Sequence, residues 1–178
     1  MKIKDICRLV TKSSKPSEDI VYHLYSLPAF DEQQYEEIQG CKIQSNKWEV
    51  PNRCILFNKL NVRFKRVWRI NSTYKNKLAS TEFLPLVVDE NIVDYQYFYY
   101  LLISDGITNY LCGQNSNTSG SHKRIEPSDF LDIEVQLPPM DRQQEIGRIL
   151  ADIDNKINLN RQINQNLCAR RVQVRSVA

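Results

Sequence analysis

Few of the residues that build catalytic or cofactor sites are present in this sequence. It has only five glycines, and no glycine-rich loop that could hold a nucleotide phosphate or a methyl donor. Its two histidines, His23 and His122, are far apart, and neither has a cysteine or a second histidine at metal-ligand spacing. The nucleophile elbow of serine hydrolases is missing as well. The sequence therefore predicts a protein that is not an enzyme and that has no metal or cofactor of its own.

Cysteine pairs and long apolar segments are also lacking. The five cysteines are scattered, without any Cys-x-x-Cys pair: Cys7, Cys41, Cys54, Cys112 and Cys168. Such a set is typical of reduced thiols in a cytoplasmic protein rather than of a disulfide framework or a zinc site. No signal peptide is recognisable, and no segment approaches the roughly 18 apolar residues of a membrane span. We therefore expect a soluble, cytoplasmic protein that does not contact a membrane.

One cluster of carboxylates could hold magnesium. It contains Asp31, Glu32, Glu36 and Glu37, and a nuclease needs such groups to bind its metal ion. Their spacing is equally typical of a solvent-exposed helix, which is the interpretation we favour. A nuclease is therefore the weakest of the functional hypotheses.

Positive charge is concentrated in one part of the chain, although the net charge is only +3. No acidic residue occurs between Glu49 and Glu82, and aromatic residues such as Phe64 and Trp68 lie within this interval. Its basic residues are Arg53, Lys59, Arg63, Lys65, Arg66, Arg69, Lys75 and Lys77. A stretch of one charge sign with aromatic residues inside it is typical of a nucleic-acid-binding surface. A solvated sheet face with an excess of lysine and arginine remains the alternative.

Residues 1–136 have the pattern of a mixed, mostly β domain. Strands are predicted at 21–27 and at 54–57, where the continuous apolar run is typical of a buried strand. The alternation at 62–65 restarts one residue out of phase at 66–70, which predicts a bulge in a half-buried strand. A further strand is predicted at 83–88, where Pro85 favours an edge position or a bulge. Residues 93–103 predict a helix capped by Asp94, with a strand as the weaker alternative.

The segment 113–121 contains no apolar residue and is predicted to be a loop. His122, Lys123 and Arg124 follow it directly. A turn or short helix is then predicted at 127–131. It is followed by a strand at 133–137, which the two prolines at 138–139 stop.

After Pro139 the pattern changes to that of a long helix, for which Asp141 is the expected N-cap. Residues 142–169 would extend over about 42 Å at roughly 1.5 Å per residue. Positions spaced alternately by four and three residues form a heptad seam: Ile146, Leu150, Ile153, Ile157, Asn160, Asn164 and Leu167. The seam predicts association with another helix, and its polar positions would fix the register at some cost in stability. An amphipathic helix packed on its own domain is the alternative.

The segment from Leu137 to Ile157 resembles the conserved region of Type I restriction specificity subunits. In that family a target-recognition domain ends in Leu-Pro-Pro, and a long helix begins shortly afterwards. The residues that fall on the family pattern are Gln143, Ile146, Ile149, Leu150, Asp154, Lys156 and Ile157. Segments 54–59, 79–83, 95–102 and 120–131 resemble the family's upstream landmarks in the same order. The resemblance covers roughly residues 1–168.

The resemblance implies an α+β protein that reads DNA. A mixed, mostly β target-recognition domain would span residues 1–139, a spacer and dimerisation helix 140–170, and an atypical tail 171–178. Family members hold two recognition domains apart with an antiparallel pair of helices, which sets the distance between two DNA half-sites. Modification subunits would bring S-adenosylmethionine and methylation, and restriction subunits would bring ATP, magnesium and cleavage.

Two sets of residues are expected to contact double-stranded DNA. Phosphate contacts, which contribute affinity but carry no sequence information, are expected from Lys59, Arg63, Lys65, Arg66 and Arg69, extended by Lys75 and Lys77. Base contacts are expected from Gln114, Asn115, Asn117, Ser121, His122, Lys123 and Arg124. A solvent-exposed turn without a role in binding is the alternative for the second set.

The chain departs from the family pattern in three places. It stops after one domain and one helix, its last residues from Arg170 onwards lack the family's apolar helix end, and Arg142 stands where an acid is usual. The first departure suggests a half-length subunit that restores two recognition domains as a homodimer and reads two equal half-sites. The alternative is a truncated or regulatory subunit that binds the modification subunits without reading DNA.

Overall fold

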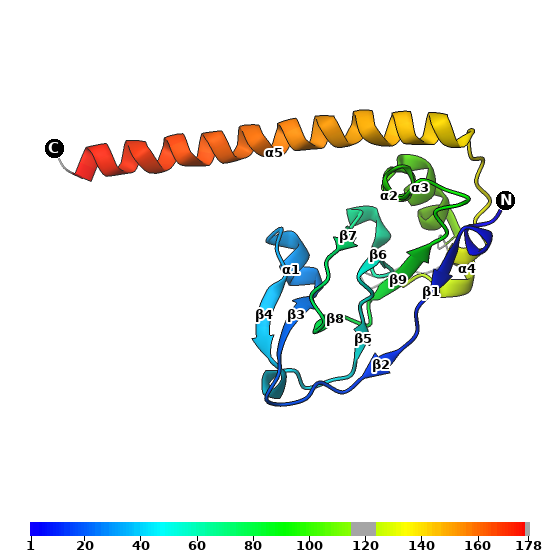
Figure 1. Cartoon of the computed structure of the whole chain (residues 1–178), viewed down its shortest axis with the longest axis horizontal. Coiled ribbons are helices and arrows are strands. Elements are labelled where there is room, and N and C mark those ends of the chain that lie inside the picture. Colours follow the sequence, from blue (N-terminus) through cyan, green and yellow to red (C-terminus); the bar gives the residue numbers. More distant parts are fainter. Residues whose placement is uncertain (115–123, 177–178) are drawn as a thin grey trace.

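Two β-sheets form the centre of the molecule, short helices cover one of them, and one long helix runs along the outside (Figure 1). The computed structural model describes residues 1–114 and 124–176. Within these ranges the first sheet is antiparallel and has the order β1 (Cys7–Leu9), β9 (Phe83–Val88), β6 (Arg53–Asn58) and β7 (Val67–Asn71). The predicted α+β class is confirmed.

The second sheet is built mostly from the N-terminal part of the chain. Its order is β2 (Ser13–Ser14), β5 (Lys47–Glu49), β8 (Lys77–Ala79), β3 (Val21–Tyr25) and β4 (Glu36–Gln39). The pair of β3 and β8 is parallel and the other pairs are antiparallel. On this sheet the His23 ring is stacked between those of Tyr35 and Tyr74, with centroids 4.0 and 3.8 Å away.

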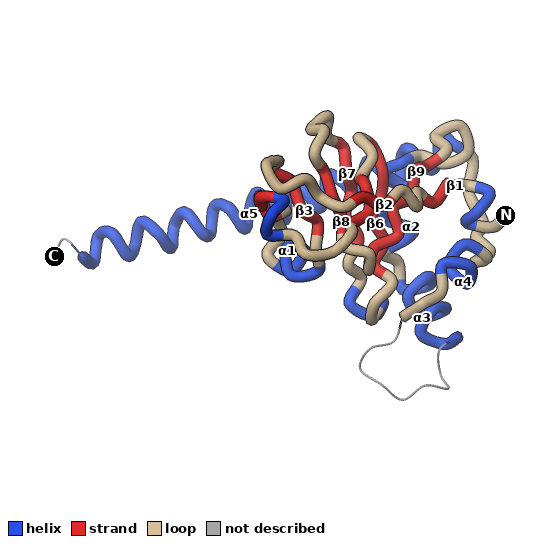
Figure 2. Tube along the Cα trace, turned by 90° about the horizontal axis from the view of Figure 1, so that it is seen from below, coloured by secondary structure: helices blue, strands red, loops and turns tan. Residues whose placement is uncertain are grey.

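The remaining elements are short helices, apart from one. They are η1 (Ile3–Asp5), α1 (Leu27–Asp31), η2 (Gly40–Lys42), η3 (Val62–Phe64), α2 (Tyr95–Leu102), α3 (Asp105–Gln114), α4 (Pro127–Leu131) and the long α5 (Met140–Ser176). Figure 2 shows α3 and α4 on the side of the molecule away from the C-terminal end of α5.

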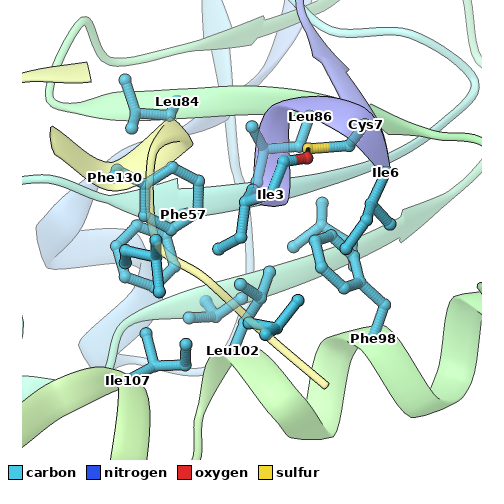
Figure 3. Close-up of a cluster of buried hydrophobic side chains, with 14 of the residues drawn as sticks. Ile3, Ile6, Cys7, Phe57, Leu84, Leu86, Phe98, Leu102, Ile107 and Phe130 are labelled. Atoms are coloured by element: carbon cyan, nitrogen blue, oxygen red, sulfur yellow. Dashed lines mark hydrogen bonds between the residues drawn. The ribbon is translucent and has the colours of Figure 1, made fainter. Parts of the chain in front are cut away.

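Strand β6 is buried on both faces, as its continuous apolar run predicts. Ile55 and Phe57 join the core between the first sheet and the helices, where Phe98 and Phe130 also lie (Figure 3). The intervening residues, such as Leu56, join a second core between the two sheets. A strand with both faces covered needs apolar residues at every position rather than at alternate ones.

Three predicted strand features are wrong. The expected bulge at 62–70 is the turn η3, followed by a separate strand, β7. Pro85 lies in β9, which is an inner strand between β1 and β6. Proline has no backbone N–H to donate, and Pro85 lies just beyond the last residue of β9 that pairs with β1. Residues 133–137 form no named strand. The N-terminal segment pairs with them over a short distance only, through an isolated bridge between Lys2 and Glu134.

The predicted helix with Asp94 as its cap is confirmed as α2. The Asp94 carboxylate accepts a hydrogen bond from the Tyr97 backbone N–H at 2.8 Å, which satisfies one of the free donors at the helix N-terminus. The short helix at 127–131 is confirmed as α4. Helix α3 was not predicted from the sequence.

Helix α5 begins at Met140 and has 37 residues, which corresponds to about 55 Å at roughly 1.5 Å per residue. Asp141 therefore lies in the first turn and is not the predicted N-cap. A negative charge at this position is still favourable, because it faces the positive end of the helix dipole. The helix continues seven residues beyond its predicted end at residue 169.

Gln143 joins the start of α5 to the start of α2. Its side chain is only 2% exposed. The Oε1 atom accepts a hydrogen bond from the Asp94 backbone N–H at 2.9 Å, and the Nε2 atom donates to the Pro138 carbonyl at 2.9 Å and to that of Ile92 at 3.5 Å. This buried amide therefore ties together three segments of the chain.

Gly147 and Asp154 continue the same face of α5 along α2. A Cβ atom at Gly147 would lie 2.9 Å from the Tyr97 backbone nitrogen, so only glycine allows this approach. Farther along, the Tyr100 hydroxyl donates a hydrogen bond to the Asp154 carboxylate at 2.7 Å. The direction of α5 relative to the sheets is thus fixed by contacts between residues 143 and 154.

Candidate nucleic-acid interface

The connection between β6 and β7 is a tight turn that presents basic and aromatic side chains outward. Asn58, at the end of β6, accepts a hydrogen bond from the Leu60 backbone N–H at 2.9 Å. Asn61 and Lys65 on either side of η3 have left-handed backbones, with φ of 51° and 47°. Val62 is buried beneath the turn. We call residues 59–66 the basic turn.

Four of the five predicted phosphate contacts lie on the basic turn. Arg63 is exposed, and Lys59, Lys65 and Arg66 are half-buried. The Lys65 ammonium pairs with Asp105 at the start of α3. The turn is therefore a local concentration of positive charge that α3 supports from the side.

Arg66 is held in place by a bidentate ion pair. Its Nε and Nη2 atoms donate to the two carboxylate oxygens of Asp31 at 2.8 and 2.7 Å. This hydrogen bonding is the main reason why the pKa of the Asp31 carboxyl lies below its ordinary value. The guanidinium is fixed in a plane that also suits two phosphate oxygens.

Arg124 brings the second predicted set next to the first. Its guanidinium forms a bidentate pair with Glu82 at 2.9 and 2.7 Å, which lowers the pKa of the Glu82 carboxyl. A β-bridge joins Arg124 to Leu60, and the Ile125 backbone N–H donates to the Lys59 carbonyl at 3.0 Å. The described residue that follows the segment 115–123 therefore lies beside the basic turn, and α3, which precedes this segment, packs on η3.

The predicted base-contacting residues Asn115, Asn117, Ser121, His122 and Lys123 lie outside the described residues. Gln114 is the last residue of α3. The roles of all these residues stay predictions.

Two of the basic residues are placed elsewhere. The Arg69 guanidinium lies 4.3 Å from the centroid of the Tyr99 ring, so this side chain packs on α2 rather than on the basic turn. Lys77 is only 2% exposed and donates to the Asn52 side chain at 2.8 Å and to the Ser72 carbonyl at 3.0 Å. The suggested phosphate contact by Lys77 is therefore wrong: this lysine is a buried structural residue.

The sequence indicated Phe64 only as one of several aromatic residues in the basic stretch, and the structure places it on the basic turn as a functional candidate. Phe64 is 52% exposed, and the guanidinium groups of Arg63 and Arg66 lie 4.9 and 5.0 Å from the centroid of its ring. The aromatic residues within the basic stretch pointed to Phe64 among others, whereas the slip in alternation at 65–66 marks the turn that exposes it. A turn at that place exposes an aromatic residue that a strand would have buried.

The predicted heptad seam of α5 lies beside the face that contacts α2. At about 100° per residue, Ile153 and Ile157 lie roughly 60–120° around the helix from Gly147 and Asp154. Ile153 is 51% exposed. Ile146 and Leu150 are half-buried, whereas Ile157, Asn160, Asn164 and Leu167 are exposed. The seam beyond Leu150 is thus not covered by the described part of this chain.

The described residues contain no group of three or more His, Cys, Asp or Glu side chains that could hold a metal ion. Within the same residues, no helix has both the length and the apolar character to cross a membrane.

Comparisons with known proteins agree with this arrangement. The model of the family described as Type I restriction modification DNA specificity domain matches residues 1–169. The Type I restriction enzyme HindI specificity subunit of Haemophilus influenzae is 30% identical over 113 residues, which are 64% of this chain and 25% of that protein.

Solved structures show the same fold. The HsdS subunit from Thermoanaerobacter tengcongensis aligns with a TM-score of 0.75 and 17% identity over 92% of this chain and 43% of the other. The S subunit from M. genitalium aligns with a TM-score of 0.57 and 15% identity over 89% and 39%. The chain thus spans less than half the length of these relatives. With its family match extending from the first residue almost to the end of α5, this chain belongs to the family of Type I restriction-modification DNA specificity domains.

Proposed function

We propose that this chain recognises a double-stranded DNA sequence as a specificity subunit of a Type I restriction-modification system, and that it carries out no chemistry itself. The family match over residues 1–169 is the observation that carries this proposal. The basic turn supports it, because Arg124 and Ile125, distant in the sequence, contact the positively charged residues 59–66 there.

The basic turn would position the chain on the phosphate backbone. Arg66 and Lys65 are paired with exposed carboxylates, Asp31 and Asp105. The exposed pair of Lys65 is weak, and a DNA phosphate can accept the two parallel hydrogen bonds that Asp31 accepts from Arg66. Each phosphate contact releases counterions and makes binding weaker as salt rises. Base discrimination would come from the polar residues that follow α3, by hydrogen bonds to groove edges.

A second copy of the chain would supply a second recognition domain. The exposed apolar seam of α5 supports this part of the proposal, because a heptad seam is stabilised by a facing helix. An antiparallel pair of α5 helices would place two recognition domains at opposite ends of a two-fold symmetric dimer. Such a dimer would read two equal half-sites.

The chemistry would be contributed by other subunits. Modification subunits would dock on the helices with S-adenosylmethionine, and restriction subunits would add ATP-driven movement and magnesium-dependent cleavage. This chain would direct them to the target site.

A methylation map tests the DNA-reading role. The chain is co-expressed with its modification subunits, and the modified DNA is sequenced at single-base level. A symmetric, interrupted motif is the expected result. A stable complex with the modification subunits that leaves DNA unmethylated would instead show a subunit that does not read DNA.

Dimerisation is tested with matched substitutions on α5. Ile153→Lys and Ile157→Lys place a charge in the seam, whereas Leu159→Lys places one on the other side of the helix, where Leu159 is also exposed. Light scattering after size exclusion should show a dimer for the wild type and for Leu159→Lys, and a monomer for the seam variants. Equal masses for all four proteins would contradict the proposed seam.

A further inference from the structure

The exposed ring of Phe64 is held in a fixed place. The turn that carries it is closed by two left-handed residues, Asn61 and Lys65, and is anchored by the buried Val62. The ion pair between Lys65 and Asp105 further ties the turn to α3. Val62 is thus the residue of the turn that packs into the core, whereas the Phe64 ring is 52% exposed.

Two cations flank this ring. The guanidinium of Arg66 is fixed by Asp31, and that of Arg63 lies on the exposed side of the turn. Both guanidinium groups lie over the ring, 4.9 and 5.0 Å from its centroid, and Phe64 is still 52% exposed. Phosphate groups and nucleobases lie close together along a DNA strand. A cation next to an aromatic ring can therefore contact a phosphate while the ring contacts a base.

Electrostatics around the ring favour a polyanion over an apolar partner. Segment 59–66 has four basic residues and no acidic one. Asp105 and Asp31 pair with Lys65 and Arg66. An apolar protein partner would have to desolvate these ion pairs as well as Lys59 and Arg63, which is costly. A nucleic acid supplies the matching charge through its phosphates and a flat apolar face through its bases.

We propose that Phe64 stacks on a nucleobase of the bound DNA, as a wedge at a base-pair step or as a platform for an unstacked base. This inference rests on the proposed DNA-reading function and deepens it. Aromatic side chains inserted at a base step unstack it, and the energy required depends on the sequence. Phe64 would thus contribute to specificity without forming any hydrogen bond.

Fluorescence anisotropy with a labelled duplex that carries the mapped methylation motif tests the proposal. The full chain is compared with Phe64→Ala, Phe64→Trp, Arg63→Ala and Tyr110→Ala, where Tyr110 is an exposed aromatic control on the neighbouring α3. Stacking contributes about 1–3 kcal/mol per base, so Phe64→Ala should weaken binding roughly 5- to 150-fold. Phe64→Trp should bind like the wild type, and Tyr110→Ala should have little effect.

The salt dependence distinguishes stacking from a phosphate contact. Phe64→Ala should leave the slope of log K against log salt unchanged, whereas Arg63→Ala should reduce it by about one. A reduced slope for Phe64→Ala, or binding within twofold of the wild type, would overturn the proposal. Thermal unfolding of each variant checks that the fold is intact.

Abasic duplexes identify the base. Each position of the motif is replaced in turn by an abasic site, and wild type and Phe64→Ala are compared on every duplex. At the stacked position the difference between the two proteins should disappear. If it persists at every position, Phe64 does not stack on a base. A wild type that fails to bind the intact duplex would refute the DNA-reading function itself, before any Phe64 variant is measured.

Discussion

Replacing Gln143 by alanine would remove the amide that joins α5 to α2 and to the chain before it. The Asp94 backbone N–H would lose its partner at 2.9 Å, and the Pro138 carbonyl would lose a donor at the same distance. Gln143 is only 2% exposed, so water cannot easily replace it. An unsatisfied buried group costs about 1–3 kcal/mol, and two such groups give an expected loss of about 2–6 kcal/mol in the free energy of unfolding.

Gln144→Ala is the matched control, since it removes the same side chain from the next position, which is exposed. Both variants change helix propensity equally, and the control should stay within about 0.5 kcal/mol of the wild type. Urea unfolding measures the loss, and amide exchange at Asp94 should accelerate only in Gln143→Ala. Equal urea midpoints for the two variants would refute the reasoning that a buried amide fixes α5.

Further tests concern the DNA surface, the second sheet and the contact between α2 and α5. Arg66→Ala should weaken binding to all duplexes equally and flatten the salt dependence, whereas Asn117→Ala should change the preference at one base position; identical, sequence-independent losses in anisotropy titrations would contradict this division. His23→Phe should reduce the loss of stability at acidic pH. Burial is the main cause that lowers the pKa of His23, so the unfolded chain binds the proton more readily, and the free energy of unfolding of the wild type should fall as pH drops through about 6.5. Urea titrations at neutral and mildly acidic pH should show this fall for the wild type and a smaller one for the variant, and equal falls would exclude His23 as the cause. Tyr100→Phe should lower stability by about 0.5–1.5 kcal/mol, because it removes the hydrogen bond to Asp154; an unchanged urea midpoint would show that this bond does not hold α5.

The sequence predicted correctly those elements that are determined by residues close to one another in the chain. The cap of α2 follows from the position of Asp94 before a helical pattern, and the burial of β6 follows from its unbroken apolar run. The start of α5 after Pro139 follows from the change in periodicity. In each of these, the side chains that decide the structure are close together in the sequence.

Contacts between distant segments account for the errors. Pro85 is tolerated in an inner strand because β1 ends beside it, which nothing near Pro85 reveals. Lys77 resembled its basic neighbours in the sequence, but acceptors from Asn52 and Ser72 converge on its ammonium group in the fold. The charges of the candidate interface were visible in the sequence, whereas the exposure of Phe64 depends on a turn that closes only when β7 pairs with β6.

Helix α5 is attached to the domain only near its start, so a small tilt there moves its far end by a much larger distance. Its contacts with α2 end near Asp154, and the remaining residues to Ser176 correspond to about 33 Å at roughly 1.5 Å per residue. A tilt of about 6° at the attachment would displace the far end by about 3.4 Å, which is the rise of one base pair. The close approach at Gly147 therefore limits the tilt of α5, and through it the displacement of the far end of the helix relative to the length of one base pair. A substitution there could alter the spacing between half-sites without changing any residue that touches DNA.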